Sequence, residues 1–423
     1  MNRFLNAFKL PDLRKKILMI LLWLFVFRLL AAIPIPGIDP LRLEQFFSSN
    51  QLFGFLNIFS GGGLSNLSIM MLGVGPYITA SIIMQLLTII FPQLKKAYYE
   101  EGAEGRAKFN RISRYLTAPL AALQSYGFLN LLISQGAIDR LPLGALLVNV
   151  VVISAGSILL MWIGELISEY KIGNGVSLII FAGIVSGLPT IVSQSIATFT
   201  PAAVPTYLAF VILSVIVIAG VVFISEGERK IPVSYAKQVR GNRLYGGVST
   251  YLPLKVNQAG VIPIIFAISL LLFPQFLAQV SSIISPELSV KLNELVGRAF
   301  NNIFIYSAAY FILVVVFTYF YTAITFDPAE ISKNLQRAGG FIPGIRPGLA
   351  TADIIKKTVG RTTFFGALFL GVVAILPNLT QIFTGIKFLT IGGTALLIVV
   401  SVALDIMKQL ESQLVVREYE GVM

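Results

Sequence analysis

The sequence predicts an all-α polytopic membrane protein, with ten transmembrane helices in two inverted five-helix halves and a cytoplasmic hairpin loop. Three observations predict this fold class. The 423 residues are 56% hydrophobic and only 12% charged, with a mean hydropathy of +0.82, whereas soluble domains carry about 25% charged residues. Ten apolar segments are long enough to cross a bilayer, and two of them share a short motif.

The ten predicted spans are apolar stretches of about 20 residues, the length that a helix needs to cross the hydrocarbon core. The first span is long, is followed by Pro and Gly, and lacks a small-residue cleavage pattern. We therefore expect a retained span rather than a cleaved signal peptide. The predicted spans are residues 17–33, 69–91, 115–133, 143–164, 176–195, 206–225, 258–280, 303–325, 363–379 and 389–407.

Basic residues orient these spans. With the N-terminus in the cytoplasm, 26 of the 32 Lys and Arg residues fall in cytoplasmic segments, five fall in outer segments, and Arg28 lies in the first span. The positive-inside rule therefore places both termini in the cytoplasm. The net charge of +12 belongs to the cytoplasmic face, where it can attract anionic lipid or a ribosome, so nucleic acid is not required to explain it.

Two spans share a motif that suggests an internal repeat. Residues 73–78 read GVGPYI and residues 260–265 read GVIPII, and the two spans run in opposite directions. An inverted repeat of five plus five spans requires this relation, and its halves would be residues 1–200 and 201–423. Because Gly and Pro weaken helical hydrogen bonding, we expect both spans to bend there. The alternative is the ordinary frequency of Gly and Pro in membrane helices.

The residue types exclude several classes of function. The chain has no Cys and no His, so disulfides, thiolate metal sites and imidazole catalysis are excluded. Neither a GxSxG nor a Walker A motif occurs, so we expect no enzyme activity, no cofactor and no nucleotide site. The spans carry almost no charge at mid-membrane, which argues against an ion-coupled carrier.

Three consecutive glycines, Gly61 to Gly63, follow an apolar stretch, Phe53 to Phe59, that is too short to cross the membrane. No Lys follows the glycines closely, so a phosphate cradle is disfavoured. A turn or a hinge is left as the interpretation, because residues without a Cβ let the chain change direction sharply.

Two large cytoplasmic loops are suited to docking a partner. In residues 226–257, polar and apolar residues alternate before an Arg240-Gly241-Asn242 turn, which predicts a β-hairpin. In residues 326–362, two Pro-Gly pairs hold Arg346 at a stiff exposed tip. A stiff tip loses less entropy on binding than a mobile loop does, although most loop arginines are simply solvated.

Seven strings, in order and on the predicted spans and loops, carry a specific resemblance: IPIPGID (33–39), NIFSGGGLS (57–65), LGVGPYITASIIMQLL (72–87), IGNGVSLIIFAGIVSGLP (172–189), LPLKVNQAGVIPIIFA (252–267), GGFIPGIRPG (339–348) and GGTALLIVV (392–400). Through them the chain resembles, over nearly its whole length, the SecY/Sec61-alpha family of protein-conducting channels.

The resemblance implies ten spans in two inverted halves, an hourglass pore for unfolded secretory polypeptides, and a lateral gate that releases hydrophobic segments into lipid. It implies a bacterial plasma (inner) membrane location. The implied partners are the small subunits SecE and SecG, the motor ATPase SecA, the ribosome, signal sequences, nascent polypeptides and the lipid bilayer, with energy supplied by a partner.

The resemblance also assigns a pore ring and a plug. An aliphatic ring at mid-membrane would dewet a narrow neck and block ions. Without the resemblance, each of its members would count as packing or lipid-facing. A short plug helix at about residues 53–64 would lie under the ring on the outer side, with the glycines as its hinge. The ring residues are Val74, Ile78, Val176, Ile180, Ile265 and Ile398, and the plug and hinge residues are Phe53, Phe55, Asn57, Phe59, Gly61, Gly62 and Gly63.

The remaining assignments concern the gate and docking. The lateral gate is expected between the second and seventh spans, although an Asn or Gln there can also simply bond to a neighbouring helix. The alternative function is a secondary transporter of a small solute, and a membrane enzyme is a distant third. The gate residues are Gly73, Pro76, Gln85, Asn257, Gly260 and Pro263, and the partner-binding residues are Arg229, Lys230, Lys237, Arg240, Arg243 and Arg346.

Overall fold

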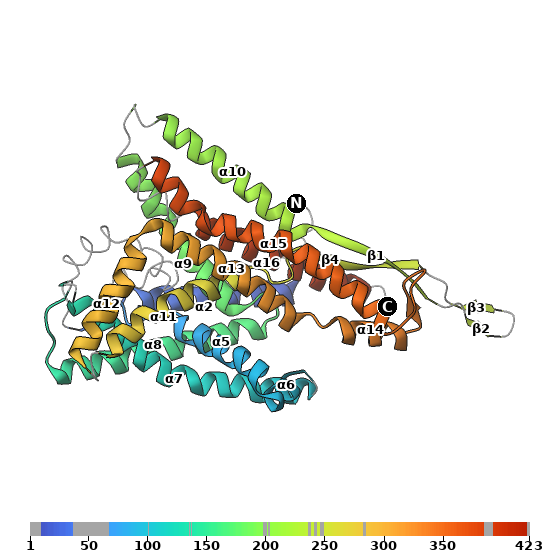
Figure 1. Ribbon diagram of the computed structural model, residues 1–423, viewed down its shortest axis with the longest axis horizontal. Coiled ribbons are helices and arrows are strands. Elements are labelled where there is room, and N and C mark those ends of the chain that lie inside the picture. Colours follow the sequence, from blue (N-terminus) through green and yellow to red (C-terminus); the bar gives the residue numbers. More distant parts are fainter. Residues whose placement is uncertain are drawn as a thin grey trace.

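A computed structural model shows a helical bundle whose helices run mostly along the long axis of the molecule (Figure 1). A slender β-sheet projects from one end of the bundle (Figure 1). The sheet belongs to the loops predicted to be cytoplasmic, so this end is taken as the cytoplasmic side. The structure describes residues 10–36, 67–99, 101–134, 136, 138–197, 201, 204–235, 238–240, 243–245, 249–281, 285–384 and 392–420.

Each of the ten predicted spans overlaps one helix of the described chain. Within that part of the chain, five helices are long and apolar enough to cross a membrane by length and composition. The predicted class, a mostly helical polytopic membrane protein, is therefore confirmed. The helices are α2 (Pro11–Ala31), α5 (Gly75–Ile90), α7 (Gly102–Ser134), α8 (Leu143–Glu169), α9 (Gly175–Ala197), α10 (Val204–Glu226), α11 (Ile262–Val280), α13 (Ile303–Thr325), α15 (Leu349–Thr384) and α16 (Gly392–Glu420).

The two helices that carry the shared motif begin at it instead of bending there. Gly73 and Gly260 have positive φ angles of 57° and 63°, two residues before α5 and α11 begin. Pro76 and Pro263 are the second residues of these helices, where a missing N–H loses no helical hydrogen bond. The expected bends are therefore wrong at this motif, because glycine turns the chain and proline starts the helix.

Several helices extend into, or lie entirely within, the predicted loops. α15 begins at Leu349, inside the loop predicted at residues 326–362, and α16 likewise runs beyond its predicted span. At the start of α14 the Asp327 carboxylate accepts hydrogen bonds from the N–H groups of Ala329 and Glu330 at 2.8 and 3.3 Å, a helix cap that the sequence interpretation overlooked. The additional helices are α6 (Pro92–Tyr99), α12 (Pro286–Asn301) and α14 (Pro328–Arg337).

The largest hydrophobic core runs through the bundle and receives side chains from most of the spanning helices. Phe27 of α2 and Tyr310 of α13 are almost completely buried in it. Because lipid tails are as apolar as leucine, such contacts stabilise a membrane bundle by close packing rather than by removal of water. α10 leaves most of its apolar side chains exposed, as expected of a helix that faces lipid.

A mostly buried segment of irregular backbone, residues 67–74, precedes α5. It is tied to the end of α2, because the Ile69 N–H donates to the Ile33 carbonyl oxygen at 3.0 Å. α8 packs directly against it, since a Cβ added at Gly156 would overlap the Ile69 carbonyl oxygen. The missing side chain at Gly156 thus makes room for this segment inside the bundle.

The hairpin predicted in residues 226–257 is confirmed. β1 (Glu228–Tyr235) pairs antiparallel with β4 (Ser249–Lys255), and β2 (Gln238–Arg240) pairs antiparallel with β3 (Arg243–Tyr245). A fifth strand, β5 (Gly340–Phe341), adds to the other edge of β1. The last cytoplasmic loop therefore shares a sheet with the hairpin, a connection that a two-residue strand does not reveal in the sequence.

We expect Gly156→Ala to destabilise the protein, because the added methyl group would overlap the Ile69 carbonyl oxygen and overpacking costs about 1–3 kcal/mol. Gly144→Ala in the same helix is the matched control, since no described residue lies within 4 Å of its Cβ position. Alanine's higher helix propensity should leave the control as stable as the parent or more so. Thermal unfolding of the purified complex measures both variants, and equal midpoints would contradict the close contact.

Candidate functional site

Two of the predicted pore-ring residues mark the start of α5. Val74 directly precedes the helix, and Ile78 lies one turn further, where its N–H donates to the Val74 carbonyl oxygen at 3.1 Å. Both side chains are buried, with 1% and 7% of their surface exposed. The irregular segment before α5 thus places the start of this helix, with Val74 and Ile78, in the interior of the bundle.

The other ring residues come from three further helices and join the same hydrophobic core. Ile180 of α9, Ile265 of α11 and Ile398 of α16 are buried, while Val176 at the start of α9 is partly buried. All six predicted ring residues therefore belong to the large hydrophobic core that runs through the bundle, and whether they form a ring within it stays a prediction. Aliphatic side chains at such a place exclude water and ions, because nothing in them can replace the lost hydration.

The helices predicted to flank the lateral gate, α5 and α11, contact each other directly. α7 packs against both of them, and α13 packs against α11. The shared motif has the same local structure in both helices. The Ile265 N–H donates to the Val261 carbonyl oxygen at 3.4 Å, just as the Ile78 N–H donates to the Val74 carbonyl oxygen at 3.1 Å. The two motif copies are thus equivalent in structure, and the extension of this repeat to two whole halves stays a prediction.

The predicted polar gate residues, Gln85 and Asn257, each bury a side-chain oxygen that finds no hydrogen-bond partner within the described residues. Asn257 uses its amide nitrogen to donate to the Gly260 carbonyl oxygen at 3.1 Å. A buried acceptor left unpaired costs about 1–3 kcal/mol. Both oxygens are therefore free to accept a hydrogen bond from water or from a chain that enters beside them.

Sequence reasoning overlooked two contacts near these residues. The Gln124 amide of α7 donates to the Thr79 hydroxyl of α5 at 3.3 Å, which joins the two helices by a polar contact inside the bundle. A Cβ added at Gly366 of α15 would lie 2.8 Å from the Val256 carbonyl oxygen, beside Asn257. The only sequence signals were a lone Gln and a lone Gly in apolar spans, and neither identifies its partner.

Three cytoplasmic segments share a small hydrophobic core, which we call the docking platform: the strands β1 and β4, the loop at residues 339–348, and the start of α15. Ile231 of β1 and Leu254 of β4 pack with Ile342 of the loop and with Ile355 of α15. Each segment alone is too short to bury its apolar face, so the platform forms only when all of them meet.

Arg346 is exposed on the docking platform. On one side of it, the Thr351 hydroxyl donates to the Arg346 carbonyl oxygen at 3.0 Å, and on the other, the buried Ser332 hydroxyl donates to the Gly348 carbonyl oxygen at 2.7 Å. Gly344 and Gly348 have φ angles of 81° and 102°, which side chains with a Cβ rarely adopt. Hydrogen bonds and backbone geometry thus hold the arginine turn in place.

The other predicted docking residues are placed less completely. Arg229 and Lys230 are exposed on β1. Arg240 and Arg243 lie opposite each other in the antiparallel register of β2 and β3. Outside the described residues lie Lys237 and the plug and hinge residues Phe53, Phe55, Asn57, Phe59, Gly61, Gly62 and Gly63.

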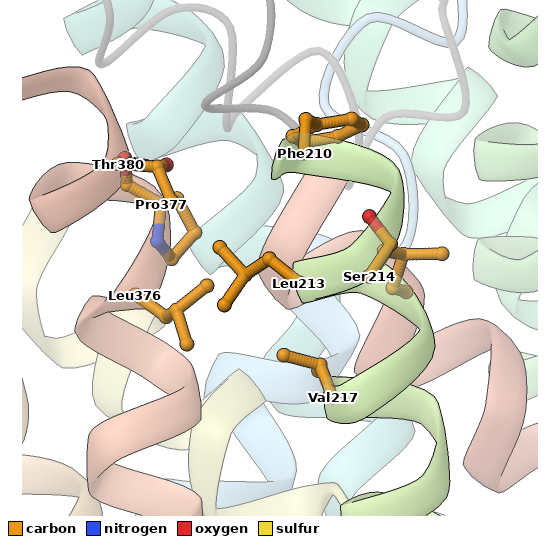
Figure 2. A pocket seen from close by; sticks show the side chains of 8 residues that line it. Phe210, Leu213, Ser214, Val217, Leu376, Pro377 and Thr380 are labelled. Carbon is orange, nitrogen blue, oxygen red and sulfur yellow. Dashed lines mark hydrogen bonds between the residues drawn. The ribbon is translucent and has the colours of Figure 1, made fainter. Parts of the chain in front are cut away.

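An apolar crevice lies between α10, α15 and α16. Figure 2 shows Leu213 pointing from α10 toward Leu376 and Pro377 of α15. Ser214 and Thr380 supply the only polar side chains of its lining. Among the described residues no group of Asp and Glu side chains could hold a metal ion. The lining of the crevice thus contains two hydroxyl groups and no ionisable side chain.

The SecY family model matches residues 68–407, which is most of the chain. The chain belongs to the SecY family. Relatives named protein translocase subunit SecY align with the whole chain. The relative from Mycobacterium bovis is 42% identical, and the alignment covers 99% of its length. The relative from Corynebacterium glutamicum is 44% identical, and the alignment covers its full length. The relative from Thermotoga maritima is 40% identical over 99% of this chain and 96% of its own length.

Solved structures share the fold of this SecY-family chain. A protein conducting channel superposes with a TM-score of 0.65 at 22% identity, over 93% of this chain and 90% of that one. Sec61 from a canine ribosome-channel complex of the endoplasmic reticulum superposes with a TM-score of 0.60 at 21% identity, over 93% and 90%. At these identities the likeness shows the fold alone.

Family membership confirms the predicted function. The chain is a protein-conducting channel subunit of a Sec translocase, a multi-pass membrane protein and not an enzyme. The alternative, a secondary transporter of a small solute, finds no support. The individual roles of the ring, gate, plug and docking residues stay predictions.

We expect Ser332→Ala to loosen the Arg346 turn without changing any charge, because the Gly348 carbonyl loses its buried donor. The loss should cost about 0.5–1.5 kcal/mol. Hydrogen–deuterium exchange of residues 339–348 should become faster, and this is the measurement. Ser412→Ala is the control, since that exposed hydroxyl bonds only to the Lys408 carbonyl of its own helix. Unchanged exchange in the first variant would show that the turn does not depend on Ser332.

Proposed function

We propose that this chain forms a passive polypeptide pore sealed by Val74, Ile78, Val176, Ile180, Ile265 and Ile398. The observation that carries the proposal is that all six aliphatic side chains lie in the hydrophobic core that runs through the bundle. Aliphatic side chains close a narrow neck to ions by dewetting it. They offer no hydrogen bonds that would favour one sequence, so the same neck can surround many different polypeptides.

The lateral gate is proposed between α5 and α11, which contact each other. The unpaired oxygens of Gln85 and Asn257 make this helix contact less stable than a wholly apolar one would be. Sorting at the gate would follow partitioning into lipid: Leu or Phe gains about 0.3–0.6 kcal/mol at mid-bilayer, whereas Arg or Lys costs about 2.5–3.5 kcal/mol. A single charge can therefore offset several leucines.

Energy must come from a partner, because the sequence carries no nucleotide-binding motif. The exposed Arg346, Arg229 and Lys230 on the docking platform support docking of a motor ATPase such as SecA and of the ribosome. Hydrogen bonds around Arg346 support this role, because a preorganised turn loses little entropy on binding. The small subunits SecE and SecG complete the proposed complex.

The proposed location is the bacterial plasma membrane, with both termini in the cytoplasm. Bacterial relatives and the excess of basic residues in the cytoplasmic segments support it. The plug assignment, from Phe53 to the glycines at 61–63, remains a proposal from the family resemblance, with a hinge as the role of the glycines.

A photocrosslinking amino acid at Ile265 should react with a stalled secretory chain in the intact complex, because the proposed ring surrounds the chain. Val215 of α10 is the matched control, since 60% of its side-chain surface is exposed on the outside of the bundle. Adduct formation on a denaturing gel is the measurement. An intact complex that gives no adduct at position 265, or equal adducts at both positions, would contradict the proposed pore.

Replacing a ring residue with a polar one should let water into the neck. We expect Ile398→Asn to increase ion leak through reconstituted channels, while Ile398→Val, which keeps an aliphatic side chain, should leave the seal nearly intact. Conductance across planar bilayers measures the leak. If the asparagine variant folds and stays as tight as the parent channel, Ile398 does not belong to the seal.

A further inference from the structure

α12 occupies the segment between the spans α11 and α13, where the sequence predicted only an outer loop. It contacts both of these helices. Figure 1 shows α12 at the end of the bundle opposite the β-sheet, lying across the direction of α13. Among the α12 residues whose burial the structure describes, Val296 is buried, with 7% of its surface exposed. The helix therefore lies over the outer ends of two spans.

The four charged residues of α12 form one ridge. Glu287, Lys291, Glu294 and Arg298 are all exposed, and their three- and four-residue spacing keeps them within about 60° around a helix of 3.6 residues per turn. Arg298 pairs with Glu294 at 2.5 Å. Two acids and two bases give the ridge no net charge, and it points away from the side that carries Val296.

Apolar residues flank this ridge on both sides. Val290 and Leu295 lie about 40° beyond its two edges by helical geometry, and they are 66% and 68% exposed. Both edges of α12 thus present apolar surface that stays uncovered within the described residues.

A candidate membrane span begins directly after α12. A single residue, Asn302, separates α12 from α13, and its side chain accepts hydrogen bonds from the N–H groups of Phe304 and Ile305 at 3.0 and 3.4 Å. These two residues open a helix that is long and apolar enough to span a membrane, and they are 69% and 51% exposed. The apolar edges of α12 therefore adjoin the exposed apolar surface of a candidate membrane span.

We propose that α12 is an interfacial helix of the outer leaflet. Val290 and Leu295 contact the boundary between lipid headgroups and acyl chains, while the charged ridge faces water, the arrangement of helices that lie in a membrane surface. The balanced charge of the ridge means that zwitterionic lipid is sufficient. Because α12 contacts α11 and α13, this anchorage holds the outer ends of both helices at a fixed depth in the membrane.

The absence of cysteine from the chain makes the test direct. Single-cysteine variants Val290→Cys and Leu295→Cys report on the edges, and Lys291→Cys and Glu294→Cys are matched ridge controls in the same helix. Each is labelled with a nitroxide in the full complex, reconstituted in phosphatidylcholine vesicles. Power-saturation electron paramagnetic resonance then compares accessibility to oxygen, which enriches in lipid, with accessibility to a water-soluble nickel chelate.

The expected result is a shift of the oxygen-to-nickel ratio toward oxygen at positions 290 and 295 relative to 291 and 294, unchanged when phosphatidylglycerol is added. Equal ratios at all four positions would place the edges in water and overturn the proposal. Labels at 290 and 295 that are immobile and inaccessible to both reagents would mean that a protein partner covers α12, which also overturns it. Dependence on anionic lipid would contradict the balanced ridge.

Discussion

The hydrocarbon core supplies no hydrogen bonds, so every backbone polar group at membrane depth must find a partner inside the protein. This constraint decides where the chain can be irregular. The segment before α5 departs from helix only where it is enclosed: the Ile35 N–H donates to the Leu67 carbonyl at 2.8 Å, and Gly73 and Met70 close a turn at 2.8 Å. Its residues lie against α8, where Gly156 leaves room for the backbone.

Enclosed irregular backbone is also where the proposed seal begins. Because α5 starts at Gly75 rather than at the outer surface, Val74 and Ile78 reach the interior of the bundle. The entry to α11 repeats this arrangement, with a glycine of positive φ, a proline in the first turn, and Ile265 at the place of Ile78. In the proposed gate, side-chain packing holds the two helices together. Such contacts can break and form again, whereas a continuous ladder of backbone hydrogen bonds would resist opening.

The cytoplasmic docking platform depends on a different principle. Water is available there, so its backbone need not be enclosed, and its stability comes from a small core shared by β1, β4, the 339–348 loop and α15. β4 leads within a few residues to Asn257 and α11, and Gly366 of α15 packs closely against that connection. A partner bound to the platform therefore contacts a unit that is covalently continuous with the proposed gate helix.

Hydropathy alone located the ten apolar helices, because membrane insertion selects for apolar length irrespective of neighbours. Alternation of polar and apolar residues located the hairpin, and the orientation drawn from the basic loops stays a prediction. Pattern also marked the 73–78 and 260–265 motifs, but not that they start helices, since Gly and Pro serve equally at a bend and at a helix start. Only the tertiary structure decided which of many isoleucines share one core, that Gln85 and Asn257 bury unpaired oxygens, and that β5 joins β1. Those facts depend on contacts between segments that are distant in the sequence. Because the apolar side chains of this sequence are so alike, only the packing of the folded chain decides which of them are in contact.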